Sequence, residues 1–371
     1  MPLTQQDSVS LMTDVVEQLQ AIDYVELYVG NAVQAAHYYQ SAFGFTPVAY
    51  AGLETGSRDR VSYVMQKDDC YFVLTAPLTS EGPIAEHVKR HGDGVKDIAF
   101  RVKDVRKIFA SAVQLGASPL LEPTELEDEG GRVLKATIAT YGDNVHTFIQ
   151  RDGFAGTFLP AYQPLKLQQA PWTGLHTIDH FAICLPYGEL TQWVQFYMQV
   201  FGFQQIHEEG IVTEYSAAKS IAVQDRTESI KFVLLEPIPG KKKSQIEEFL
   251  KFHEGPGVQH VALQTQEIVK SIEALEANGV GFVAAPSSYY EMLPERVGAV
   301  SEEISDLRKE NILVDSDEWG YLLQIFSQPV HNRPTLFIEI IQRKNARGFG
   351  SGNIQALFKA LEREQSRRGN L

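Results

Sequence analysis

Short apolar segments alternate with helical patterns along this chain, and the first of these combinations occurs twice. Residues 22–29 and 178–185 match in residue type and order, and both have the composition of a strand. A helical stretch follows each strand and ends on the same Phe-Gly-Phe triplet, at 43–45 and at 201–203. The two copies are 156 to 158 residues apart, which indicates an internal repeat.

Two further pairs of segments support this repeat. A glycine-rich turn leads into a strand at 91–100 and again at 254–263. A β-rich segment that ends in Gln-Arg closes each half, at 145–151 and at 337–343. Three matches in one order predict two similar halves.

Helical patterns follow the strands at 91–100 and 254–263, and another follows the last strand of the second half. The sequence predicts helices near 105–115, 268–278 and 353–367. The last has apolar residues on one face, and Asn353 at its start is a candidate N-cap.

The boundary between the halves is expected in a segment that is rich in proline and glycine and has no clear period, residues 152–174. We therefore predict an N-terminal domain over 1–155 and a C-terminal domain over 156–371. A length of 371 residues agrees with two domains.

Composition and charge narrow the class of protein. Apolar residues make up 44% of the chain and charged residues 22%, as in globular proteins with a real core. The net charge of −14 argues against nucleic acid as a partner. Two cysteines, Cys70 and Cys184, do not form a disulfide framework and suggest a reducing, cytoplasmic location. We find no signal-peptide pattern in the first twenty residues and no long apolar window, so we expect neither secretion nor a membrane partner.

The second half holds metal-type ligands at three positions where the first half does not. His180 replaces Tyr24, His260 replaces Asp97, and Glu339 replaces Thr147. Two imidazoles and one carboxylate are the ligands of the facial triad of non-haem Fe(II) oxygenases. Each ligand belongs to a different predicted strand, as a site inside a curved sheet requires.

A structural role for these residues stays open on the residues alone. Most histidines are surface or hydrogen-bonded groups, and we interpret four others in this way: His176, His207, His253 and His331. A purely structural role is harder to accept for Glu339, because an unpaired carboxylate in the apolar segment 335–341 would be costly to bury. It should have a cation beside it.

Several motifs make a family resemblance visible over nearly the whole chain. They are residues 240–246, 257–260, 320–326, 332–343 and 348–353. With these motifs the sequence resembles the 4-hydroxyphenylpyruvate dioxygenases of the vicinal-oxygen-chelate superfamily. The resemblance implies an α+β fold of tandem domains, each built of paired βαβββ modules that form a half-open barrel, plus a C-terminal helix.

The resemblance also implies the residues of the active site. His180, His260 and Glu339 would bind Fe(II), and the expected catalytic side chains are Gln245, Gln259, Gln324 and Asn353. The expected substrate-binding positions are Ser220, Val233, Leu235, Phe326, Phe337, Phe349, Ile354 and Phe358, with Phe326 and Phe349 as ring clamps. The C-terminal helix would act as a lid. For the polar residues ordinary hydrogen bonding is the alternative, and for the aromatic residues core packing is.

By this resemblance the reaction converts 4-hydroxyphenylpyruvate, a small 2-oxo acid, and O2 to homogentisate and CO2. Val233, Leu235 and Ile354 depart from the usual dioxygenase pattern and resemble the sister family, the 4-hydroxymandelate synthases, whereas Phe358 resembles the dioxygenases. A non-catalytic homologue that binds an aromatic ligand or a metal is a further alternative. We also expect a homo-oligomer, with the metal-free N-terminal half as a candidate for subunit contacts.

Overall fold

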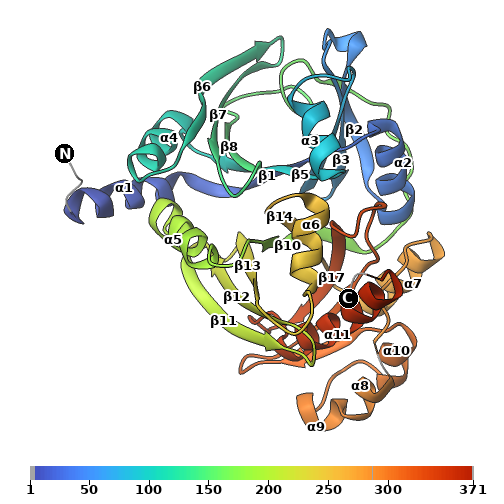
Figure 1. Ribbon diagram of the computed structural model, residues 1–371. Helices are drawn as coiled ribbons and strands as arrows, with labels where there is room; N and C mark the ends of the chain where they lie inside the picture. The colour runs from blue at the N-terminus through green and yellow to red at the C-terminus, as the bar shows by residue number, and fades with distance from the viewer. Residues whose placement is uncertain (1–4, 286, 370–371) are drawn as a thin grey trace.

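The computed structural model describes residues 5–285 and 287–369, which form two curled mixed sheets with helices packed against them (Figure 1). The first sheet has the strand order β6-β7-β8-β5-β1-β4-β3-β2-β9, and the second has the order β11-β12-β13-β10-β14-β17-β16-β15. In Figure 1 the first sheet lies above the second, and the red helix α11 crosses the second sheet.

The strands and helices form four successive modules. The first sheet contains β1 (Leu19–Tyr28), β2 (Thr46–Ala51), β3 (Arg60–Lys67), β4 (Cys70–Pro77), β5 (Gly94–Val102), β6 (Pro119–Asp128), β7 (Gly131–Ala139), β8 (Val145–Gln150) and β9 (Gln163–Pro164). The second contains β10 (Leu175–Cys184), β11 (Gln204–Val212), β12 (Ala217–Gln224), β13 (Lys231–Ile238), β14 (Gly257–Thr265), β15 (Leu313–Ser316), β16 (Tyr321–Phe326) and β17 (Phe337–Lys344). The helices are α1 (Gln5–Gln18), α2 (Ala32–Phe43), α3 (Pro83–His91), α4 (Val105–Gln114), α5 (Leu190–Phe201), α6 (Gln245–His253), α7 (Ile268–Ala277), α8 (Ser287–Glu291), α9 (Leu293–Val297), α10 (Ile304–Lys309) and α11 (Ser351–Arg367). Each module begins β-α and continues with three strands, which confirms the predicted α+β fold.

The repeated Phe-Gly-Phe triplets end equivalent helices. Gly44 follows α2 with φ +72° and Gly202 follows α5 with φ +66°, a left-handed conformation that glycine adopts without steric cost. A Cβ on Gly44 would also lie 2.4 Å from the carbonyl oxygen of Pro171. Glycine is therefore the residue that lets the chain turn from each helix into the next strand.

Alternation along the strands separates a helix-covered face from a concave face. On β10, Phe181 and Ile183 belong to the large core that joins the two sheets, whereas Ala182 and Cys184 belong to a separate cluster inside the second sheet. Aromatic contacts cross between the sheets, including the rings of Phe100 and Phe232 with centroids 6.4 Å apart. The two concave faces thus point away from this shared core.

The C-terminal helix begins at Ser351 after Gly350, so the predicted N-cap at Asn353 is wrong; Asn353 lies within the first turn. The two residues of β9 pair with β2 of the first sheet although they follow residue 155, and the division at 155/156 stays a prediction. None of the helices among the described residues is long and apolar enough to span a membrane.

Candidate metal centre

His180, His260 and Glu339 lie on three adjacent strands, β10, β14 and β17. Ala262 on the middle strand pairs with His180 on one side and with Glu339 on the other, and His260 is two residues earlier on β14. The period of two along a strand places all three side chains on the concave face.

The three predicted ligands converge on one point. Their ligand atoms all lie within 4.8 Å of one another. Glu339 Oε2 is 3.3 Å from His180 Nε2 and 3.2 Å from His260 Nε2. The residues are 1%, 3% and 7% exposed for Glu339, His180 and His260. Sequence comparison of the two halves thus selected residues that the fold brings together.

Charged neighbours hold the triad in a defined ionisation state. Burial alone would raise the pKa of Glu339, but the two histidines hold it lowered, to about 2. Burial disfavours the charged ring of His180, whereas Glu339 and Asp179 raise its pKa to about 8. Burial lowers the pKa of His260. The site therefore carries a carboxylate charge that favours a cation.

Asp179 and Arg343 form the layer behind His180. Asp179 Oδ1 is 2.9 Å from His180 Nδ1, and Arg343 donates to both oxygens of Asp179 at 2.7 and 2.8 Å. Burial would raise the pKa of Asp179, but Arg343 and His180 hold it well below its ordinary value. An aspartate on Nδ1 fixes the ring so that Nε2 faces the other two ligands, as in metal-binding histidines.

The donor set fits a divalent cation. Two ring nitrogens and one carboxylate oxygen point at each other in a buried site, and a cation would satisfy all three. His260 Nδ1 is buried and has no hydrogen-bond partner among the described residues. The same ligand set suits several transition metals, with Fe(II) the metal of the facial triad.

A chain of hydrogen bonds leads from Glu339 to a second layer of side chains. Gln324 Nε2 donates to Glu339 Oε1 at 2.8 Å, and Asn353 Nδ2 donates to Gln324 Oε1 at 2.9 Å. The Tyr289 hydroxyl has two acceptors for its one proton, Asn353 Oδ1 at 2.6 Å and the carbonyl oxygen of Val314 at 2.8 Å, and it accepts from the guanidinium of Arg296 at 2.6 Å. Gln324 and Asn353, both predicted site residues, therefore contact the triad or each other.

Aromatic rings surround the triad. The ring centroid of Phe337 is 4.9 Å from that of His260, and that of Phe326 is 6.1 Å away. The ring of Phe349 is 5.2 Å from that of His180, at an interplanar angle of 90°. Three of the four predicted aromatic residues thus form a wall beside the ligands.

The remaining predicted residues line the same concave face. Val233, Leu235, Phe349 and Phe358 share one apolar cluster, against which Ile354 packs. Ser220 is buried and pairs with Leu235 across β12 and β13. Gln259 on β14 donates to Gln245 at the start of α6.

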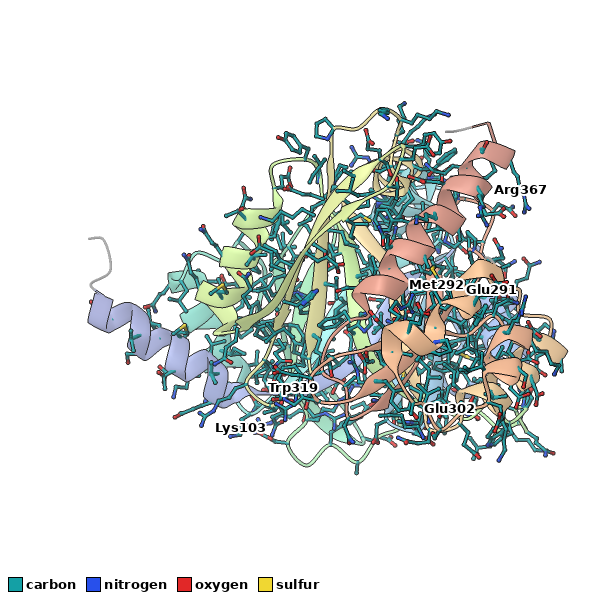
Figure 2. All side chains as sticks on the ribbon, turned by 90° about the horizontal axis from the view of Figure 1, so that it is seen from below. Lys103, Glu291, Met292, Glu302, Trp319 and Arg367 are labelled. Carbon is teal, nitrogen blue, oxygen red and sulfur yellow. The ribbon has the colours of Figure 1, made fainter. Side chains whose placement is uncertain are left out.

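Helix α11 closes this face. The cavity lined by Gln245, Gln259, Phe326, Phe337, Leu357 and Leu361 has a volume of about 30 Å³, room for about one water molecule. Arg368 at the end of α11 forms an ion pair of 2.6 Å with Glu248 of α6. Figure 2 shows α11 with Arg367 near its end and Glu291 and Met292 of the α8–α9 segment beside its start.

Four residues that support the ligands or their hydrogen-bond partners were not predicted from the sequence: Asp179, Arg343, Tyr289 and Arg296. Asp179 and Arg343 could have been found, because the matched segments carry Asp23 and Arg151 at the equivalent places, and that pair also forms ion pairs. Tyr289 and Arg296 gave no signal, since they lie on α8 and α9, between α7 and β15, where the first half has no such helices.

Comparison with known proteins places the chain in a superfamily. The family model described as Glyoxalase/Bleomycin resistance protein/Dioxygenase superfamily matches residues 21–144 and 177–296. The two matches fall on the two sheets.

Several relatives are similar over almost the full chain. A protein of Yarrowia lipolytica named 4-hydroxyphenylpyruvate dioxygenase is 42% identical over 97% of this chain and 96% of its own length. Proteins of the same name from Dictyostelium discoideum and Danio rerio are 43% and 45% identical, over 95% and 94% of this chain and 100% and 91% of theirs. A solved structure of a triple mutant of 4-hydroxymandelate synthase from Streptomyces coelicolor is similar, with a TM-score of 0.85 and 38% identity, over 94% of this chain and 99% of that one.

Proposed function

Because this chain belongs to the 4-hydroxyphenylpyruvate dioxygenase family, we propose that it converts 4-hydroxyphenylpyruvate and O2 to homogentisate and CO2. The observation that carries the proposal is the convergence of His180, His260 and Glu339 in one buried site. These three residues would hold Fe(II). When bound there, Fe(II) would supply open coordination positions for a 2-oxo acid and O2, and the electrons that activate O2.

The protein's own contribution is to hold the ligands and exclude water. Asp179 fixes the ring of His180, and Gln324 fixes the carboxylate of Glu339. Phe326, Phe337 and Phe349 offer faces and edges against which an aromatic ring can pack. Gln245 Nε2 is buried without a hydrogen-bond partner among the described residues, so it is free to donate to a polar group of the substrate. The closed position of α11 keeps bulk water from the reacting atoms.

The direct test is O2 uptake by anaerobically prepared, Fe(II)-loaded protein on addition of 4-hydroxyphenylpyruvate, followed by chromatography of the product. We expect one O2 consumed and one CO2 released per homogentisate. Glu339→Gln serves as the inactive control. Absence of substrate-dependent O2 uptake would favour the non-catalytic alternative instead.

A second candidate, 4-hydroxymandelate synthase, takes the same substrate. Val233 and Leu235 favour it, because both present alkyl groups on the wall of the concave cluster where the dioxygenase pattern has a proline and an amide. With Leu235 in place of an amide, this wall offers no hydrogen bond to a polar group of the substrate at that position. The same chromatography decides, because 4-hydroxymandelate as the main product would replace the first proposal.

Location and assembly complete the proposal. Cys70 and Cys184 are both buried and free, which supports a reducing, cytoplasmic compartment. We also propose a homo-oligomer, which sedimentation of the purified protein would test.

A further inference from the structure

The concave face of the first sheet holds a cavity of about 530 Å³, within the range of ~300–1,000 Å³ usual for small-molecule sites. It lies in the half that lacks the metal ligands. Tyr24 lines it at the position that His180 occupies in the second sheet, since both pair with an alanine of the neighbouring antiparallel strand, Ala99 and Ala262. The cavity is therefore the counterpart of the metal centre, with different chemistry.

Two opposite charges face this cavity without meeting. Glu26 lines it from β1, and Thr75 Oγ1 donates to its Oε1 at 2.6 Å. Lys135 lines it from β7. Within the described residues neither side chain forms an ion pair within 4 Å. Burial has the largest effect on the pKa of Glu26 and raises it, whereas the hydrogen bond from Thr75 and the charges of Arg60 and Lys135 lower it. A charged ligand group of opposite sign would satisfy each of them.

Aromatic rings form a wall of the same cavity. Tyr24, Phe158 and Tyr162 all line it. Their rings make edge contacts, with centroid distances of 5.5 Å for Tyr24 and Phe158 and 5.2 Å for Phe158 and Tyr162. Such a wall can pack against an aromatic ring, and it attracts an ammonium group through the ring faces.

We propose that the first half-barrel is a binding site for a small zwitterion with an aromatic body, an aromatic α-amino acid. Its ammonium group pairs with Glu26, its carboxylate with Lys135, and its ring packs on the wall of Tyr24, Phe158 and Tyr162. Arg60, exposed at the rim and paired with Asp59 at 3.6 Å, offers the carboxylate a second cation. The site is separate from the metal centre and does not depend on the proposed reaction.

Titration calorimetry of the full-length protein with L-phenylalanine tests the site. We expect one molecule bound per chain in the wild type. Glu26→Gln keeps the acceptor for Thr75 but removes the charge, and Lys135→Met removes the ammonium group; each should weaken binding about tenfold or more, as the loss of a charged hydrogen bond does. Glu127→Gln, an exposed glutamate on β6 of the same sheet, is the matched control and should bind as the wild type does.

Two analogues test the chemical class. Phenethylamine lacks the carboxylate and 3-phenylpropionate lacks the amine, so both should bind more weakly than the amino acid. Binding of either one as tightly as L-phenylalanine would overturn the zwitterion assignment. Absence of saturable binding would overturn the site itself. Unchanged binding in Glu26→Gln would overturn it too, because it would mean that the amino acid binds elsewhere, for example in the second half-barrel.

Discussion

Glu339 supplies the negative charge of the proposed metal centre, and its neighbours are arranged to keep that charge. Both histidines lie within 3.3 Å of its Oε2, and Gln324 donates to its Oε1. A neutral amide at this position would remove the charge and present a donor to one of the imidazoles. The carboxylate therefore matters for binding a cation and much less for the fold, because the first half has Thr147 at the equivalent position. The strand register shows this equivalence: Asp97 pairs with Val145 in the first half as His260 pairs with Phe337 in the second.

We predict that Glu339→Gln loses iron affinity while it keeps its secondary structure. The loss should exceed the ~10–100-fold effect of changing an outer-shell partner. Metal analysis after anaerobic loading, with circular dichroism of the same sample, measures both quantities. Glu318→Gln, an exposed glutamate between β15 and β16, is the control. Retained iron in Glu339→Gln would refute the ligand assignment.

Tyr289 gives a second test at the same scale. Its hydroxyl holds Asn353, which holds Gln324, which in turn holds Glu339. Tyr289→Phe leaves Asn353 Oδ1 without this donor, so we expect kcat to fall about tenfold, at the low end of outer-shell effects, with a smaller change in KM.

The neighbouring tyrosine provides the control for that measurement. Tyr290 is also buried, but its hydroxyl has no hydrogen-bond partner among the described residues. Tyr290→Phe should therefore leave kcat unchanged. Equal effects of the two substitutions would mean that Tyr289 acts through packing and not through the chain of hydrogen bonds.

The convergence of the three candidate ligands could be predicted from the sequence because the repeat supplied an internal reference. Comparing halves isolates His180, His260 and Glu339 as differences between strands that otherwise match. The prediction that Asn353 is the N-cap of the C-terminal helix was wrong. The Asn353 amide instead forms hydrogen bonds with Gln324 and Tyr289, which belong to elements distant in the chain. No local pattern contains these contacts.

At the scale of elements, the periods of apolar residues predicted the repeated strands and the helices that follow them, whereas α1, with 14 residues, was not predicted. The predicted helices near 105–115 and 268–278 are α4 and α7, since amphipathic helices of this length carry a clear period. The short helices α8, α9 and α10 were not predicted. Each has six residues or fewer. Since α9 packs on β15, α8 on α9 and α10 on α8, their positions depend on tertiary contacts rather than on their own period.

Helix α11 is the predicted lid of the proposed site. Its end is held by the ion pair between Arg368 and Glu248, and Glu362 accepts from Ser216 at 2.6 Å. We predict that Arg368→Met loosens the end of the helix, raises KM for the substrate several-fold and leaves iron affinity unchanged. Steady-state kinetics and hydrogen exchange of α11 measure the two effects.

The adjacent arginine separates this effect from a general loss of charge. Arg367 is exposed and pairs with Glu364 within α11 itself, so Arg367→Met should leave KM and exchange unchanged. Faster exchange without a change in KM would show that the end of α11 does not control access of substrate.

At the scale of the whole molecule, the two halves meet through a shared apolar core and through α3 and α6, which lie next to each other (Figure 1). Three histidines form a cluster at the contact between these helices. The ring of His91 lies between those of His87 and His253, with centroid distances of 4.5 and 4.4 Å. His91 also pairs with Asp143 at 2.9 Å. Helix α6 begins with Gln245, which lines the small cavity beside the candidate ligands. The contact between α3 and α6 therefore connects the first half to that cavity.

The cluster predicts how stability depends on pH. Burial lowers the pKa of both His87 and His253 to about 3, whereas an unfolded histidine titrates near ~6.5. Between these values the unfolded chain binds more protons than the folded one, so the free energy of unfolding falls as the pH falls. The loss reaches about 1.4 kcal/mol per pH unit for each imidazole. This contribution is fully present above the unfolded pKa.

Substituting one of these rings should reduce that dependence. His87→Phe removes one buried titrating group and keeps an aromatic ring beside Tyr28, which is 5.2 Å from the ring of His87. Urea unfolding at pH 7 and pH 5 should then show a smaller loss of stability for His87→Phe than for the wild type. His37→Gln, an exposed histidine on α2, should keep the wild-type dependence. An unchanged difference between the two pH values in His87→Phe would mean that the acid sensitivity of the molecule arises elsewhere than at the contact between its halves.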